Sequence, residues 1–152
     1  IAEVYAWYKS RGMTLYDGLV ELFNKYGYYK EDIDTFTLMG KEGAEKIQAA
    51  LETLREKMPH SFGQSQVAAI RDYQIGIRRD LEAGDTEPLN LPRSNVLYFE
   101  MKSGSWFCIR PSGTEPKIKI YYGVSGNTDD SAREELHGLK QDVLSVIKPL
   151  LD

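Results

Sequence analysis

The fold of this chain is decided by residues 96–124, which read VLYFEMKSGSWFCIRPSGTEPKIKIYYGV. Two short apolar and aromatic runs, Val96–Met101 and Trp106–Arg110, are joined through Ser103-Gly104, a pair typical of hairpin turns. In Lys117–Val124 the apolar side chains then alternate with lysine and tyrosine. The pattern predicts three consecutive antiparallel strands, the last with one face in the core and one in water.

Helical periodicity follows on both sides of these strands. Apolar residues spaced three and four apart predict helices over Ala44–Met58 and Ala132–Leu150. The second helix is expected to begin at a cap supplied by Thr128, Asp129 or Ser131, which are the residue types that accept hydrogen bonds from the first turn. Both helices have an apolar stripe that needs a surface to cover it.

Further extended segments precede residue 96. Val67–Tyr73 is predicted to be a strand, and Tyr28–Leu38 an extended segment that reaches a strand near Thr35. The polar stretch Gln74–Asn95, with its glycines and prolines, is predicted to be a long irregular connection. Strands joined by hairpins and separated by helices indicate an α+β fold, with an antiparallel sheet and its helices packed on one face.

Two amphipathic helices are predicted at the start of the chain, over Ile1–Lys9 and Thr14–Gly27. Such a pair cannot bury its apolar faces alone. Residues 1–27 are therefore expected to be the helical tail of a preceding domain, and residues 28–152 to form the domain itself. The chain also starts inside a helix without an initiator methionine, so we expect a piece of a longer protein.

The composition argues against several classes of protein. A net charge of −4 gives no general attraction to nucleic acid or to anionic membranes. The sequence contains no run of about 18 apolar residues, the length that could span a bilayer. The single Cys108 and the distant His60 and His137 cannot form a disulfide or a zinc cluster, and Cys108 is expected to be a small buried thiol. We expect a cytoplasmic protein that binds neither nucleic acid nor membranes and holds no metal.

The loop Arg110–Pro116, between two predicted strands, has the composition of an anion site. Arg110 offers a planar fork for bidentate contact with a phosphate, and Ser112 and Thr114 offer hydroxyl groups. Gly113 lets the main chain approach a ligand closely or take a positive φ. The same residue types are also ordinary in turns, so the composition alone leaves a plain turn open.

Charged residues surround this loop. Lys117 and Lys119 fall on the polar face of the following strand and could add positive charge. Glu115 would repel a phosphate unless it turned aside to pair with a lysine or to cap a backbone amide, so we expect it to point away. The pair Tyr121-Tyr122 is expected to serve in packing. Three arginines are expected to form a solvated face rather than a basic rim: Arg71, Arg78 and Arg79.

The run RPSGTEPKIKIY, residues 110–121, resembles the phosphate-binding loop and following strand of the α-D-phosphohexomutases, the phosphoglucomutase and phosphomannomutase superfamily. Pro92–Leu97 and the Gly104–Trp106 turn are similar to the lead-in of the same family, especially in long-form phosphoglucomutases and phosphopentomutases. Similarity to the junction into the family's last domain is carried by three further segments: Thr14–Asp17, Tyr26–Tyr29 and Gly40–Gly43.

The resemblance implies the C-terminal domain of a four-domain enzyme, with a fold like that of the TATA-box-binding protein. Its loop would hold the phosphate of a bound sugar phosphate. Carried over position by position, the resemblance implies these substrate-phosphate contacts: Arg110, Ser112, Gly113, Thr114, Lys119 and, more distantly, Lys117.

The family's reaction is reversible phosphoryl transfer from a phosphoserine, which requires Mg²⁺ and a bisphosphorylated sugar. The resemblance favours interconversion of glucose 1-phosphate and glucose 6-phosphate, with glucose 1,6-bisphosphate as intermediate; phosphomannomutase and phosphopentomutase are the alternatives. The sequence contains no candidate phosphoserine loop and no aspartate cluster for Mg²⁺. The chain alone is therefore expected to bind a phosphosugar without catalysing, and its partners would be the missing N-terminal domains. An interaction domain or a nucleic-acid-binding domain stays open as the other class.

Overall fold

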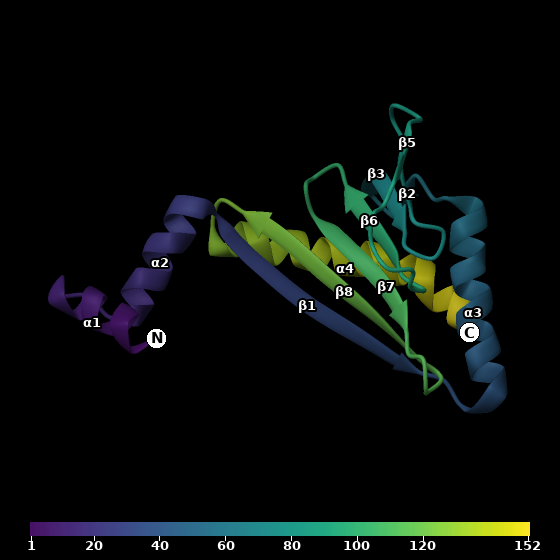
Figure 1. Ribbon diagram of the computed structural model, residues 1–152, viewed down its shortest axis with the longest axis horizontal. Coiled ribbons are helices and arrows are strands. Elements are labelled where there is room, and N and C mark those ends of the chain that lie inside the picture. Colours follow the sequence, from purple (N-terminus) through teal and green to yellow (C-terminus); the bar gives the residue numbers. More distant parts are fainter.

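A computed structural model describes residues 1–152 and has four helices and eight strands, as the α+β prediction requires (Figure 1). The elements follow in this order: α1 (Ala2–Ser10), α2 (Leu15–Tyr26), β1 (Tyr28–Thr37), α3 (Gly40–Lys57), β2 (Ser61–Phe62), β3 (Ser65–Asp72), β4 (Ile77–Asp80), β5 (Thr86–Pro88), β6 (Leu97–Met101), β7 (Trp106–Pro111), β8 (Lys117–Gly126) and α4 (Asp129–Leu151). None of the helices combines the length and the apolar character needed to cross a membrane.

The strands form one antiparallel sheet in the order β1-β8-β7-β6-β3-β4-β5, and β2 pairs with β3 outside this path. The predicted hairpin is confirmed: β6 and β7 pair directly, and Gly104 in their turn has a φ of 87°, which favours glycine. The segment Tyr28–Leu38, predicted to reach a strand only near Thr35, is a strand almost from end to end, β1. Its ten residues pair with β8 from Tyr28 opposite Gly126 to Thr37 opposite Lys117.

The prediction of an irregular connection over Gln74–Asn95 is wrong in part, because it contains β4 and β5. Strand β2 was not predicted either. These strands have four, three and two residues, too few for an alternating pattern to be visible in the sequence. Their backbone is fixed by partners: β4 pairs with Ala69–Asp72 of β3, and β5 then pairs with β4.

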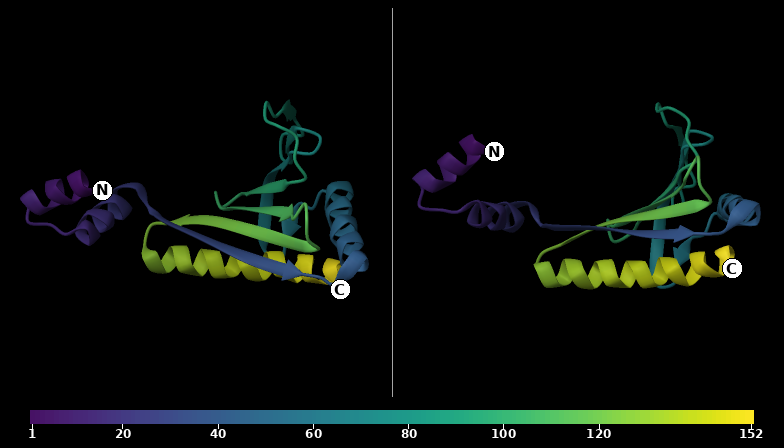
Figure 2. Two further views of the ribbon diagram at one scale, coloured as in Figure 1. Left: turned by 60° about the horizontal axis from the view of Figure 1, so that its bottom comes forward. Right: turned by 90° about the horizontal axis from the view of Figure 1, so that it is seen from below.

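Helices α3 and α4 cover one face of the sheet, which confirms the prediction. In both views of Figure 2, α4 lies along the lower face of the sheet while α3 lies near its end. The core between them is made of side chains from β8, β7, β6 and the two helices: Ile118, Ile120, Tyr122, Phe107, Ile109, Phe99, Leu51, Leu54, Leu139, Val143 and Ile147. The opposite face of the sheet carries no helix and displays the alternate residues of each strand.

Strand β1 is held against α4 by charged side chains. Lys140 of α4 donates a hydrogen bond to Asp32 at 2.6 Å and lies 3.3 Å from Asp34. Lys30 forms an ion pair with Asp129 at 2.7 Å. The hydrogen bond from Lys140 is also the main cause that lowers the pKa of Asp32. These pairs explain why acidic residues occur in a strand, where they are otherwise disfavoured.

The predicted helix caps are present. The Thr14 hydroxyl accepts a hydrogen bond from the Asp17 amide, and the Asp17 carboxylate accepts one from the Thr14 amide, which forms a capping box at α2. At α4 the cap is Thr128, whose side chain accepts from the amide of Ser131. Each arrangement satisfies amide groups that have no partner inside the helix.

Helices α1 and α2 lie apart from the rest of the molecule (Figures 1 and 2). They pack on each other where Tyr8 meets Gly18: a β-carbon at Gly18 would lie 2.3 Å from the Tyr8 ring. Most of their apolar side chains have no cover within the chain and are exposed: Ile1, Val4, Tyr5, Trp7, Leu15, Tyr16, Leu19 and Leu22. The helix pair therefore presents an apolar surface that the sheet does not bury.

Candidate functional site

The loop between β7 and β8 is fixed by backbone hydrogen bonds. The Ser112 amide donates to the Lys117 carbonyl at 2.7 Å, and the Lys117 amide donates to the Glu115 carbonyl at 2.7 Å. The Leu38 amide donates to the Pro116 carbonyl at 2.9 Å, which ties the loop to the segment before α3. Both ends of the loop are thereby held while its tip faces outward.

A depression of about 270 Å³ opens on the helix-free side of the sheet at this loop. We call it the loop depression, and its lining residues are Arg110, Pro111, Ser112, Gly113, Glu115, Lys117, Lys119 and Tyr121. Arg110 and Lys119 lie directly opposite each other on neighbouring strands. The structure therefore brings together five of the six residues implied by the resemblance. The sixth, Thr114, is exposed and does not line the depression.

The loop depression carries a surplus of positive charge. The Lys117 ammonium lies 2.8 Å from the Glu115 carboxylate, and this hydrogen bond is the main cause that lowers the pKa of Glu115. Of the two arrangements expected for Glu115, the structure has the pair with a lysine, but the prediction that Glu115 points away is wrong, because Glu115 lines the depression. Arg110 and Lys119 form no ion pair within the chain, so their charges are available to an anion.

Gly113 has no structural need of its own to be glycine. Its φ is not positive, which leaves close approach of the main chain to a ligand as the expected use of this glycine. A β-carbon at Gly113 would meet no atom within 4 Å, which leaves open space above the main chain. The Ser112 hydroxyl is only weakly engaged, since it accepts from the amides of Thr114 and Glu115 at 3.4 Å each. Both features leave the loop surface accessible to a ligand.

Tyr121 was not predicted to be a site residue, because the pair Tyr121-Tyr122 was expected to serve in packing. Its neighbour Tyr122 does pack in the core, where it is fully buried. Tyr121 instead lines the loop depression beside Lys119. The strand alternation placed Tyr121 on the same face as Lys119, and this signal could have identified Tyr121 as a site residue. Cys108, the cross-strand partner of Tyr121, is half-buried, and burial raises the pKa of its thiol, which disfavours the reactive thiolate.

Behind the loop lies a second depression, of about 220 Å³, which shares some of the loop's residues. Its other wall includes Gln48 of α3 and Asn95. The Asn95 carbonyl accepts a hydrogen bond from Arg55 at 2.6 Å, and its amide donates to Gln48 at 3.4 Å. The segment before β6 is thus tied to α3 at the back of the loop, a connection that the sequence pattern did not reveal.

The arginines near β4 form neither a basic rim nor a solvated face. Arg71 and Arg78 lie on the helix-free side and both bind Glu100, at 2.5 and 2.8 Å. Arg79 lies on the opposite side of the strand, where it contacts the Met58 sulfur. The solvated face expected from the sequence is wrong because these side chains are partly buried and have partners.

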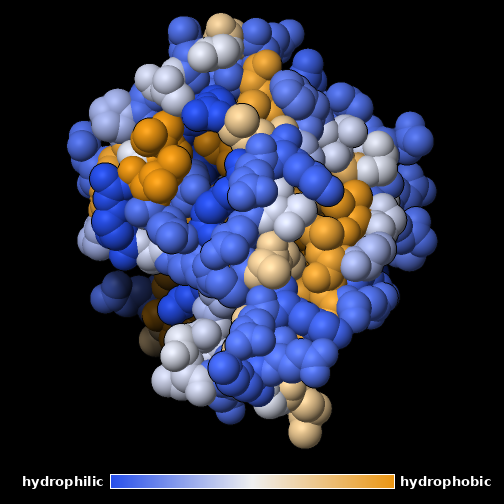
Figure 3. All heavy atoms as spheres, turned by 90° about the vertical axis from the view of Figure 1, so that its right-hand side faces the viewer, coloured by the Kyte–Doolittle hydropathy of each residue, from blue (hydrophilic) through white to orange (hydrophobic).

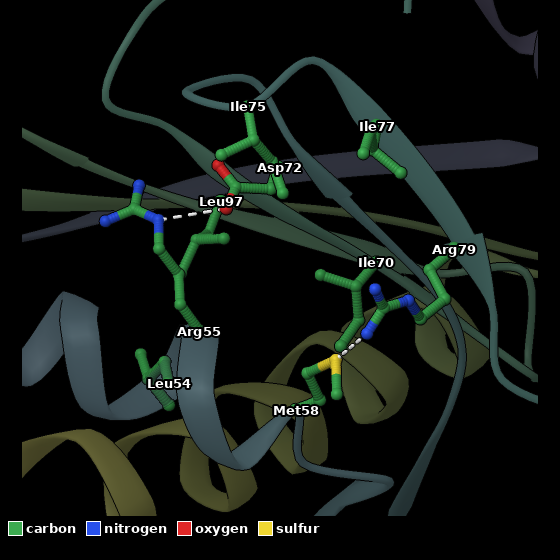
Figure 4. A pocket seen from close by; sticks show the side chains of 9 residues that line it. All are labelled: Leu54, Arg55, Met58, Ile70, Asp72, Ile75, Ile77, Arg79 and Leu97. Carbon is green, nitrogen blue, oxygen red and sulfur yellow. Dashed lines mark hydrogen bonds and ion pairs between the residues drawn. The ribbon is translucent and has the colours of Figure 1, made fainter. Parts of the chain in front are cut away.

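Arg79 lines a hollow of about 230 Å³ between α3, β3 and β4 (Figure 4). Apart from Arg55, Asp72 and Arg79, its walls are apolar: Leu54, Met58, Ile70, Ile75, Ile77 and Leu97. On the side of the molecule where α3 lies, apolar side chains reach the surface in separate patches among polar ones (Figure 3). Among the described residues, 1–152, no three His, Cys, Asp or Glu side chains are grouped so that they could hold a metal ion.

The fold and the loop depression define this chain as an α+β domain with a cationic loop site on the open face of its sheet. Residues 41–139 match the family model of the phosphoglucomutase/phosphomannomutase C-terminal domain. The chain belongs to this family of C-terminal domains.

Individual relatives agree with this family membership. The chain is 33% identical over 124 residues to a phosphoglucomutase of Staphylococcus saprophyticus, a match that covers 82% of this chain and 22% of the relative. It is 35% identical over 127 residues to a phosphoglucomutase of Staphylococcus aureus (strain USA300), covering 83% and 23%. The chain thus spans less than a quarter of the length of these relatives.

A solved structure shows the same fold. The crystal structure of pp63/parafusin from Paramecium, an exocytosis-sensitive phosphoprotein and phosphoglucomutase in its open form, matches with a TM-score of 0.54 at 14% sequence identity. The match covers 89% of this chain and 23% of parafusin. At this identity the likeness supports the fold alone.

Proposed function

We propose that this chain is the substrate-phosphate-binding domain of an enzyme that interconverts glucose 1-phosphate and glucose 6-phosphate. The observation that carries the proposal is the pair of unpartnered cations, Arg110 and Lys119, in one depression with the open main chain at Gly113. The named relatives are phosphoglucomutases, which supports glucose phosphates as the substrate.

The residues of the loop depression would hold a phosphate in complementary ways. Arg110 can donate two parallel hydrogen bonds to two phosphate oxygens, and Lys119, opposite it, adds a compact positive charge. The Ser112 hydroxyl can donate to a third oxygen. A phosphate bound here does not react, because its role is to orient the sugar toward catalytic groups on other domains.

The remaining parts of the reaction belong, in this proposal, to segments outside this chain. Mg²⁺ does not fit the described residues, which contain no cluster of ligands for it, so we place the metal, the nucleophilic serine and the glucose 1,6-bisphosphate chemistry on the other domains. The chain alone is expected to be inactive. Helices α1 and α2 are proposed to be the tail of the preceding domain, because their exposed apolar faces lie apart from the sheet.

Phosphate is expected to bind weakly and at one place. Titration of inorganic phosphate into the ¹⁵N-labelled chain should shift the amide signals of residues 110–121 with one common millimolar Kd. Signals from α1 and α2 serve as the internal control and should stay in place. Shifts confined to other parts of the chain, or none at saturating phosphate, would contradict the proposal.

Replacing Glu115 with glutamine should strengthen phosphate binding by roughly two- to fivefold, the effect of one exposed charge pair. The change removes a carboxylate that repels the ligand and releases Lys117 from its ion pair. Titration calorimetry with inorganic phosphate measures the effect. Glu82→Gln is the matched control, because Glu82 is an exposed partner of Lys102 and does not line the loop depression. Equal affinity gains in both variants would show a general charge effect and contradict this prediction.

A further inference from the structure

The helix-free face of the sheet continues beyond the cations of the loop depression. On β8, Lys119 and Tyr121 are two residues apart, so their side chains leave the same face about 6.7 Å from each other. Arg110 is the cross-strand partner of Lys119, and Cys108 and Ile33 are the partners of Tyr121. A cationic row is therefore followed by a row of aromatic and apolar character.

Tyr121 is the one aromatic residue that lines the loop depression. Its side chain is half-buried, so its ring is held by the sheet while part of it faces the depression. Within the chain its ring pairs with no other aromatic residue and its hydroxyl forms no hydrogen bond. Tyr98 and Trp106, on the same face of the sheet, differ in this respect. They stack on each other with ring centroids 5.2 Å apart, and Arg71 lies 5.1 Å from the Tyr98 ring.

We propose that Tyr121 is the platform for the sugar ring of a phosphosugar whose phosphate is bound by Arg110 and Lys119. This inference rests on the proposed function. The spacing between the row of Lys119 and the row of Tyr121 is close to the distance from the phosphorus atom of a hexose phosphate to the far side of its ring. The apolar C–H face of a pyranose can lie on an aromatic ring, and the free tyrosine hydroxyl can bond to a sugar hydroxyl. Tyr121 thereby makes the site prefer a ring-bearing phosphate to a ringless one.

The preference is measured by titration calorimetry with two phosphate monoesters, glucose 1-phosphate and glycerol 3-phosphate. The second ligand has the same phosphate chemistry without a ring. The wild-type chain should bind glucose 1-phosphate more tightly, and in Tyr121→Ala the Kd for this ligand should rise about three- to tenfold relative to that for glycerol 3-phosphate. Tyr121→Phe should keep most of the preference. Tyr29→Ala is the matched control, since Tyr29 is 63% exposed on β1 and pairs with Ser125, away from the loop.

The results separate this inference from the proposed function. If the wild-type chain binds neither ligand, the phosphate site fails, and the platform with it. If it binds both ligands equally, or if Tyr121→Ala keeps the full preference, the platform is overturned while the phosphate site stands. If Tyr121→Ala loses both ligands through a disturbed sheet, Tyr121→Leu decides, because leucine keeps apolar bulk in the strand but offers no aromatic face. Retention of the full preference by Tyr121→Leu overturns the inference, and its loss supports it.

Discussion

Replacing Arg110 with alanine is expected to abolish measurable binding of glucose 1-phosphate and of inorganic phosphate. Arg110 lines the loop depression, forms no ion pair within the chain, and lies opposite Lys119. A hydrogen bond to a charged group contributes about 1.5–3 kcal/mol. The loss of a bidentate contact therefore weakens binding at least tenfold, which moves a millimolar Kd beyond the range of calorimetry.

Two variants test whether the geometry of Arg110 matters as well as its charge. Arg110→Lys keeps the charge but loses the planar fork, so it should bind with an affinity between those of the wild type and Arg110→Ala. Arg133→Ala is the matched control, because Arg133 is an exposed arginine on α4 that pairs with Asp129. Binding heats of Arg110→Ala equal to those of the wild type would remove the phosphate site from this loop.

The parts of the fold that repeat a local pattern could be predicted from the sequence. Strand β8 alternates from Lys117 to Tyr122, and Ile118, Ile120 and Tyr122 are buried on the side of the helices as that alternation requires. The full extent of β1 could not be predicted, because its acidic residues are accommodated by Lys140, more than a hundred positions away in the chain. Partners at such distances leave no trace in a local pattern.

The candidate site divides in the same way. Residue chemistry was sufficient to indicate Arg110, Ser112 and the lysines, because they are adjacent in the sequence and their types suit an anion. The orientation of Thr114, and the position of Glu115 in the lining of the depression, depend on how the loop closes. The connection from Arg55 to Asn95 joins residues 40 positions apart, and only the folded chain brings them together.

Replacing Arg55 with methionine is expected to destabilise the chain by about 2–4 kcal/mol. Arg55 and Asp72 form the most buried ion pair of the chain, with side chains 15% and 11% exposed and an Nε to Oδ2 distance of 3.0 Å. Removal of one member of a buried pair leaves the other charge without a partner, which costs about 3–5 kcal/mol when burial is complete. The expected cost here is smaller because both side chains keep some contact with water.

The charge origin of this effect is tested by the double variant Arg55→Met with Asp72→Leu. Removing both charges leaves apolar side chains in the hollow formed by Leu54, Ile70 and Leu97, so the double variant should regain most of the lost stability. Urea unfolding gives the midpoint and slope for each variant, and Arg133→Ala should leave the midpoint almost unchanged. If the double variant were as unstable as Arg55→Met alone, the stem of Arg55 would be stabilising the fold through packing and its hydrogen bond to Asn95, and not through its charge.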